Sequence, residues 1–144
     1  MRLDEAARQY LGIPWAHQGR NPEIAIDCIG LGILACRDCG IDVPDEVEYG
    51  RDPINGLLES SLRSLFGDPA SDIRPGDIVA VRYGGNIRHV GIVGEHSAIP
   101  GELTIIHTDS RIGRVVEHRI DEGWRGRKRP AIALVFRLVM ESAE

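Results

Sequence analysis

The sequence predicts an α+β fold, because helical patterns fill its first half and strand patterns fill its second half. Apolar residues recur at helical spacing over 57–66, and a continuous apolar helix is expected over 28–39. After Gly67, short runs rich in valine and isoleucine alternate with turns that contain glycine, proline and asparagine. Such runs are typical of strands joined by turns, so we expect N-terminal helices packed on a C-terminal antiparallel sheet.

The helix expected at 28–39 has clear limits. Asp27 stands before it as an N-cap, and Gly40 stops it. Its residues are apolar nearly all round, which indicates a buried central helix. Gly30 and Gly32 lower its helix propensity, so we expect another backbone or a ligand to come close at these positions.

The other elements follow from the same patterns. A short helix is expected over Leu3–Leu11, and Gly12 and Pro14 end it. Residues 12–26 and 41–55 hold many turn-forming residues and are expected to be loops. The expected strands are 78–81, 89–93, 103–107, 114–119 and 131–136, with turns at 75–77 and 84–86.

Composition limits the class of protein. The chain has 144 residues, 42% hydrophobic and 27% charged, which predicts one soluble globular domain, 1–144. Its net charge of −5 disfavours nucleic acid as a partner. No apolar run approaches the roughly 20 residues that span a bilayer, and the first residues lack the apolar stretch of a signal peptide. We expect a protein made in the cytoplasm without a signal peptide and with no membrane partner.

Cys28 is the first candidate for chemistry. It stands in the first turn of the expected helix, where unpaired N–H groups and the helix dipole stabilise a negative charge. Such a position lowers the pKa of a thiol and offers N–H groups to an oxyanion. The alternative is a small buried apolar residue, which is the commoner role of a cysteine.

A cysteine nucleophile needs a base, which is usually histidine. The sequence offers five histidines: His17, His89, His96, His107 and His118. His89 opens an apolar strand and His107 ends another, whereas the other three are expected in loops or in solvent. On the residues alone, the choice of base and the substrate stay open.

Cys36 and Cys39 form a C-x-x-C pair, a spacing that zinc and redox sites use. No second pair of ligands stands at metal spacing, so we expect core packing instead. The odd number of three cysteines also disfavours a disulfide framework. A basic run near the C-terminus is expected to be a solvated loop or a docking site for a partner particle. Its residues are Arg125, Arg127, Lys128 and Arg129.

Several motifs, in chain order, resemble those of the NlpC-type cell-wall endopeptidases. That family has Y-x-G-x-P-Y, D-C-S-G-L/F, P-G-D-L-V and H-V-G-I-Y segments, followed by a strand that ends in a third polar residue. The matching segments here are Tyr10–Trp15, Asp27–Leu31, Pro75–Val79, His89–Val93 and Ile105–His107. Ile29 stands in place of the family's serine, and Trp15 in place of its second tyrosine.

The resemblance implies a papain-like fold and a cysteine peptidase that hydrolyses amide bonds in peptidoglycan stem peptides, without a cofactor or metal. Cys28 would attack the carbonyl, His89 would take and return the proton, and His107 would orient His89. Residues near these motifs are expected to contact the substrate. They are Trp15, Arg20, Asp27 and Arg88.

A finer resemblance concerns the branch of the family attached to phage tails or phage-like particles. Gln18–Arg20 and Val115–Arg119 are similar to segments of that branch. It implies other tail or baseplate proteins as partners, and action in the cell-wall or periplasmic space as part of a particle. A catalytically inactive tail or wall-binding module of the same fold is the alternative.

Overall fold

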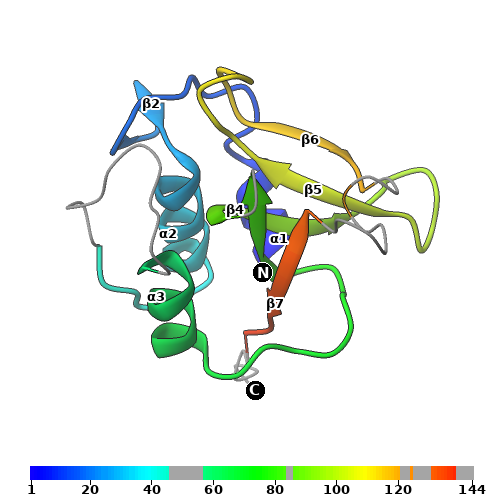
Figure 1. Ribbon diagram of the computed structural model, residues 1–144. Helices are drawn as coiled ribbons and strands as arrows, with labels where there is room; N and C mark the ends of the chain where they lie inside the picture. The colour runs from blue at the N-terminus through cyan, green and yellow to red at the C-terminus, as the bar shows by residue number, and fades with distance from the viewer. Residues whose placement is uncertain (46–56, 84–85, 121–123, 125–130, 139–144) are drawn as a thin grey trace.

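The computed structural model describes residues 1–45, 57–83, 86–120, 124 and 131–138, and its order of elements confirms the α+β prediction (Figure 1). The helices are α1 (Leu3–Arg8), α2 (Cys28–Asp38) and α3 (Leu57–Phe66). The strands are β1 (Arg20–Asn21), β2 (Ala25–Ile26), β3 (Ile78–Tyr83), β4 (Asn86–Glu95), β5 (Leu103–His107), β6 (Val116–Arg119) and β7 (Ile132–Phe136). None of the described helices is both long and apolar enough to cross a bilayer.

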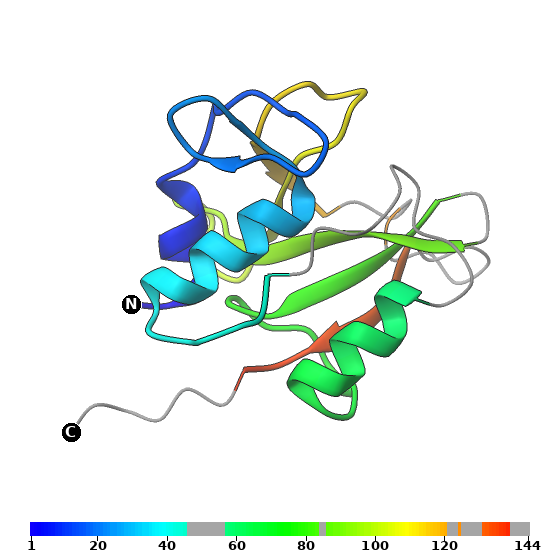
Figure 2. The same ribbon diagram turned by 90° about the vertical axis from the view of Figure 1, so that its left-hand side faces the viewer.

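The main sheet has five antiparallel strands in the order β6-β5-β4-β3-β7. All three helices contact the central strand β4, and Figure 2 shows α2 and α3 in front of the sheet. Between the helices and the sheet lies an apolar core that includes Leu31 of α2, Ile92 of β4 and Ile106 of β5, each at most 1% exposed. The predicted packing of N-terminal helices on a C-terminal sheet is therefore confirmed.

The opposite face of the sheet carries a second, smaller cluster. Val79, Val81 and Ile105 belong to it and are fully buried. His89 pairs with Val81 across β3 and β4, and His107 lies two residues after Ile105 in β5. Because side chains alternate along a strand, both histidines point to this second face.

The predicted limits of α2 are confirmed. The N–H of Gly30 donates to Asp27 Oδ1 at 2.7 Å, and Gly40 follows the helix with a φ of +79°. A Cβ atom at Gly30 would clash with the carbonyl oxygen of Gly19, whereas one at Gly32 would meet none of the described residues within 4 Å. Another backbone therefore comes close at Gly30, as expected, and no described backbone does so at Gly32.

Several predicted boundaries are wrong. Helix α1 ends at Arg8 because the next residues form tighter turns, in which Tyr10 donates to the carbonyl three residues earlier. The expected loop 12–26 contains the antiparallel pair β1 and β2. Arg114 lies outside β6 and instead forms an isolated bridge with Pro14. Some predicted features lie outside the described residues: part of the 41–55 loop, part of the 84–86 turn, and Arg125, Arg127, Lys128 and Arg129.

Candidate active site

Cys28 is the first residue of α2, and its side chain is half-buried. Burial raises the pKa of its thiol to about 12, and the nearby Asp27 carboxylate adds to this. Nearby backbone N–H groups of Val90 and Ile29 oppose this shift of the pKa. The predicted lowering of this pKa is therefore wrong, because desolvation of the thiolate outweighs the helix-end donors. Since Val90 directly follows His89 in β4, the thiol lies beside the segment that carries this histidine.

His89 of β4 and His107 at the end of β5 are 2% and 1% exposed. Their rings are joined by a hydrogen bond of 2.8 Å between His89 Nε2 and His107 Nδ1. Burial lowers the pKa of His89 to about 4 and that of His107 to about 3. Both rings are therefore neutral at pH 7. The hydrogen bond between them uses His89 Nε2, so His89 Nδ1 takes no part in it.

A β-bulge fixes the position of His89. The register of β3 and β4 runs regularly down to the pair Val81–His89 and then moves to Arg82–Ile87, so Arg88 is an extra residue in β4. A bulge bends its strand and re-aims the side chains next to it, and bulges are common beside active sites. The direction of the His89 ring therefore depends on this irregularity.

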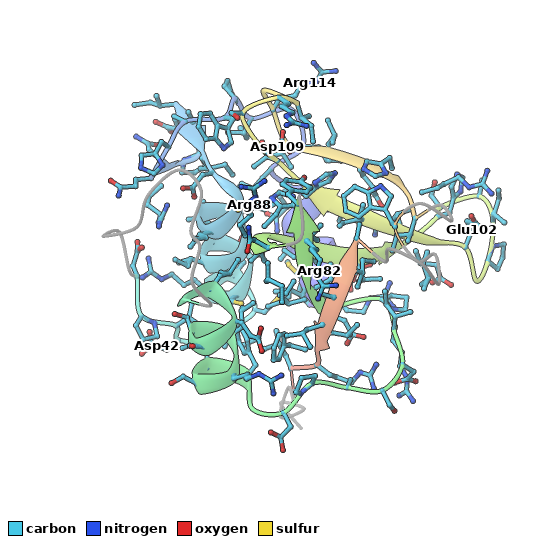
Figure 3. The ribbon with its side chains drawn as sticks, in the orientation of Figure 1. Asp42, Arg82, Arg88, Glu102, Asp109 and Arg114 are labelled. Atoms are coloured by element: carbon cyan, nitrogen blue, oxygen red, sulfur yellow. The ribbon has the colours of Figure 1, made fainter. Side chains whose placement is uncertain are left out.

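Tyr83 and Asp109 complete the surroundings of His89, and neither was predicted from the sequence. The Tyr83 ring stacks on His89, with 5.0 Å between centroids and 16° between planes. Its hydroxyl donates to Asp109 Oδ2 at 2.9 Å, and Figure 3 shows Asp109 above the end of the sheet. The Asp109 carboxylate contributes to raising the pKa values of the Cys28 thiol and of His89. Asp109 begins a turn that is closed by a hydrogen bond from the Gly113 N–H, and such a turn residue is a signal that sequence analysis could use. The residues around Tyr83 contain no comparable signal.

His118 lies in β6, within the expected strand 114–119, but the expectation that its side chain is solvated is wrong, because it is half-buried and bonds to the site. Its Nε2 is 2.8 Å from His107 Nε2, and its Nδ1 is 2.9 Å from the carbonyl oxygen of Arg119. Trp124 packs edge-on against both rings at centroid distances of 5.3 Å. The pairing of β5 with β6 creates this neighbourhood, and the sequence alone does not reveal strand register.

Asp27 and Arg20 form an ion pair of 3.0 Å next to Cys28. Asp27 is only 4% exposed, and it also accepts from the backbone N–H groups of Gly30 and Gln18 at 2.7 and 2.9 Å. Arg20 reaches Asp45 Oδ1 at 2.9 Å as well. These contacts hold the preceding loop against the start of α2, so both residues stabilise the local fold.

Trp15 and Arg88 approach the site from other elements. Trp15 is half-buried, and its backbone N–H donates to the carbonyl of Gly113 at 3.0 Å, so its loop lies beside the Asp109 turn. Arg88 is half-buried at the bulge, and its Nε finds no hydrogen-bond partner within the described residues. Figure 3 shows Arg88 between α2 and β4.

Cys36 and Cys39 lie at the other end of α2. Cys36 is 1% exposed in the helix-facing core, as expected, and Cys39 is half-buried at the C-cap. His17 and His96 lie in a turn and a loop, as expected. In the part of the chain that the structure describes, no three His, Cys, Asp or Glu side chains are grouped to hold a metal ion. Cys36 is part of the helix-facing core and Cys39 packs against it, which agrees with the expected core packing.

The arrangement suits acyl transfer by a thiol. In such a reaction Cys28 would supply the sulfur, the start of α2 would supply N–H donors, and His89 would supply a neutral nitrogen base bonded to His107. With a neutral thiol and a neutral imidazole, the proton would move as the sulfur attacks.

Solved structures of NlpC/P60 proteins share this fold. The chain is similar to the NlpC/p60 domain of the peptidoglycan hydrolase SagA, with 18% identity and a TM-score of 0.58, over 95% of this chain and 97% of that chain. It is also similar to a protein described as similar to lipoprotein, NLP/P60 family, from Staphylococcus aureus subsp. aureus Mu50, with 16% identity and a TM-score of 0.62, over 96% of this chain and 41% of that chain. No curated protein matches the sequence.

The sequence itself matches a family model over most of its length. Residues 12–129 match the NlpC/P60 family, a span that includes Cys28, His89 and His107. The expected papain-like arrangement, with helices packed on an antiparallel sheet, agrees with the fold of the SagA domain. The chain therefore belongs to the NlpC/P60 family.

Proposed function

We propose that this protein is a cysteine endopeptidase that hydrolyses amide bonds in peptidoglycan stem peptides. The observation that carries the proposal is the position of Cys28 at the start of α2, beside the β4 segment that holds the bonded pair His89 and His107. Membership of the NlpC/P60 family supports it, and the similar SagA protein is described as a peptidoglycan hydrolase.

In the proposed reaction, Cys28 Sγ attacks the scissile carbonyl carbon while His89 Nδ1 removes the thiol proton. N–H groups of the first turn of α2 stabilise the oxyanion that forms. The C–N bond then breaks, and His89 gives its proton to the leaving amine. Water attacks the thioester with His89 again as base, which releases the carboxylic acid and restores the thiol.

The substrate would be held by residues around this centre. Arg88 is half-buried at the bulge, and its guanidinium would pair with a carboxylate of the stem peptide. Trp15 would contribute an apolar ring from the neighbouring loop. Arg20 and Asp27 would act indirectly, by holding that loop against the start of α2.

We also propose that the enzyme acts in the wall as a component of a phage-like tail, with tail or baseplate proteins as partners. The support is the resemblance of two segments, Gln18–Arg20 and Val115–Arg119. Both segments also have fold contacts, for example the ion pair of Glu117 with Arg8 at 2.9 Å. Mass spectrometry of purified particles should detect this chain. Its absence from them would refute the location and leave the chemistry in place.

The decisive experiment is incubation of the purified protein with muropeptides, followed by mass spectrometry of the products. The wild-type protein should cleave a stem amide bond, and Cys28→Ala should yield no product. Cys36→Ala is the matched control on the same helix and should cleave normally. If the wild type binds muropeptides but cleaves none, the protein is the inactive wall-binding module instead.

A further inference from the structure

The hydrogen-bonded pair of His89 and His107 continues to a third histidine across the sheet. His107 Nε2 lies 2.8 Å from His118 Nε2, and His118 Nδ1 lies 2.9 Å from the carbonyl oxygen of Arg119. The three rings come from the adjacent strands β4, β5 and β6. His118 pairs with Ile105, so its ring lies on the same sheet face as the other two.

The carbonyl at the far end gives this chain of bonds one direction. A carbonyl oxygen only accepts, so His118 Nδ1 carries the proton and donates it. In its neutral form the His118 imidazole has a single N–H, and with that N–H on Nδ1 its Nε2 accepts from the Nε2–H of His107. His107 Nδ1 then accepts from the Nε2–H of His89, and the lone pair of His89 stays on Nδ1.

We propose that His118 is a positioning residue for the peptidase reaction, because its bond to the Arg119 carbonyl sets the tautomer in which His89 Nδ1 is the base. This inference rests on the proposed function, since it concerns the nitrogen that takes the proton of Cys28. His118 acts through His107 and not on the substrate.

The surroundings of the three rings favour this arrangement. His89 and His107 are buried, and burial lowers the pKa values of both, so their rings are neutral as the direction requires. Trp124 packs edge-on against His107 and His118, at 82° and 61°, which restricts both rings. The adjacent carboxylate Glu117 does not compete for His118, because it accepts from Arg8 and Thr104 on the opposite face.

A donor in place of His118 would reverse the direction. His107 Nε2 would accept from that donor, so its Nδ1 would carry the proton and donate to His89 Nε2. The proton of His89 would then sit on Nδ1, and that nitrogen could not take the thiol proton. The hydrogen-bonding character of residue 118 is therefore the variable to change.

Three substitutions separate acceptor, donor and neither. His118→Gln keeps an acceptor oxygen, His118→Leu has no polar group, and His118→Lys only donates. We expect kcat for muropeptide cleavage within about threefold of wild type for Gln, about tenfold lower for Leu, and on the order of 100-fold lower for Lys. KM should stay unchanged in all three, since no substrate contact is altered. Equal losses in all three variants would show that His118 is merely structural and would overturn the proposal.

The tautomer can be measured directly, without substrate, by ¹⁵N NMR of the ring nitrogens in protein labelled at histidine. In the wild type, His89 should be protonated at Nε2 and unprotonated at Nδ1, and His118→Lys should invert this. A wild-type His89 protonated at Nδ1 would overturn the proposal even if no variant folds. The expected tautomers without muropeptide cleavage would refute the proposed function alone, and cleavage with the opposite tautomer would refute the role of His118 alone.

Discussion

The two ends of α2 hold the same side chain in different settings. Burial raises the thiol pKa of both Cys28 and Cys36 to about 12. The sulfur of Cys28 has backbone N–H donors and the His89 segment beside it, whereas Cys36 is 1% exposed in an apolar core. A shifted pKa therefore does not distinguish the proposed nucleophile from the other thiol. The polar partners at the start of the helix are what support the proposal for Cys28.

The setting of Cys28 also indicates how its thiol would be activated. The pKa of its thiol is raised and that of His89 is lowered, so neither group is charged at neutral pH. An ion pair of thiolate and imidazolium would require the opposite shifts. The resting site is therefore a neutral pair, which supports the proposed role of His89 as a general base during the attack.

The largest expected effect separates these two modes of activation. His89→Ala should lower muropeptide cleavage on the order of 1000-fold, because the base is lost. Alkylation of Cys28 by iodoacetamide should change by less than about threefold, since there is no thiolate pair to break. Peptide mapping after a short pulse, beside cleavage assays on the same samples, measures both. Equal loss of alkylation and cleavage would show that the ion pair exists after all.

A second test compares the cysteines themselves. In the folded protein, iodoacetamide should label Cys28 at least about 100-fold faster than Cys36. Cys36 is buried, so it reacts only when the core opens by local unfolding. The Cys28 rate should rise about tenfold per pH unit from pH 7 to 9, because a raised pKa leaves the thiolate fraction far from saturation there. A rate that is flat with pH would mean a thiolate already formed at neutral pH. Unfolding in urea should make the two rates equal.

Structural features that depend on neighbouring residues were predicted well from the sequence. Asp27 and Gly40 limit α2 through a side-chain cap and a left-handed backbone, and both features are readable within a few residues. A glycine where the helix would favour alanine also pointed to the close approach at Gly30, but the same signal at Gly32 has no matching backbone among the described residues. The position of Cys28 at the start of a helix therefore follows from its immediate neighbours in the sequence.

The rest of the candidate site depends on contacts between distant segments. The pairing of β5 with β6 brings His118 to His107, and the bulge at Arg88 sets the position of His89. Tyr83 reaches Asp109 across 26 positions of sequence. Neither strand register nor a bulge follows from periodicity alone. His89 and His107 were therefore predicted from the family resemblance, and Tyr83, Asp109 and His118 were not predicted.

A third prediction compares two glycines at the start of α2. Gly30→Ala should destabilise the protein by about 1–3 kcal/mol, because its Cβ atom would clash with the Gly19 carbonyl. Gly32→Ala is the matched control, with space around it, and should stabilise the helix by about 1 kcal/mol. Urea denaturation gives both free energies of unfolding. Equal effects of the two substitutions would mean that the loop before α2 does not press on the helix.

The smallest effect is expected at the other end of the helix. Replacing Cys36 and Cys39 by alanine removes a buried sulfur and a half-buried one, which should cost about 1 kcal/mol of unfolding free energy. Cys28 should still be alkylated and muropeptides still cleaved at wild-type rates, because neither thiol contributes to the polar partners at the helix start. The metal content of the purified protein, measured before and after the change, tests the zinc alternative of the C-x-x-C pair. A metal lost with the substitution would show that this end of α2 has chemistry of its own, and the contrast with Cys28 would then fail.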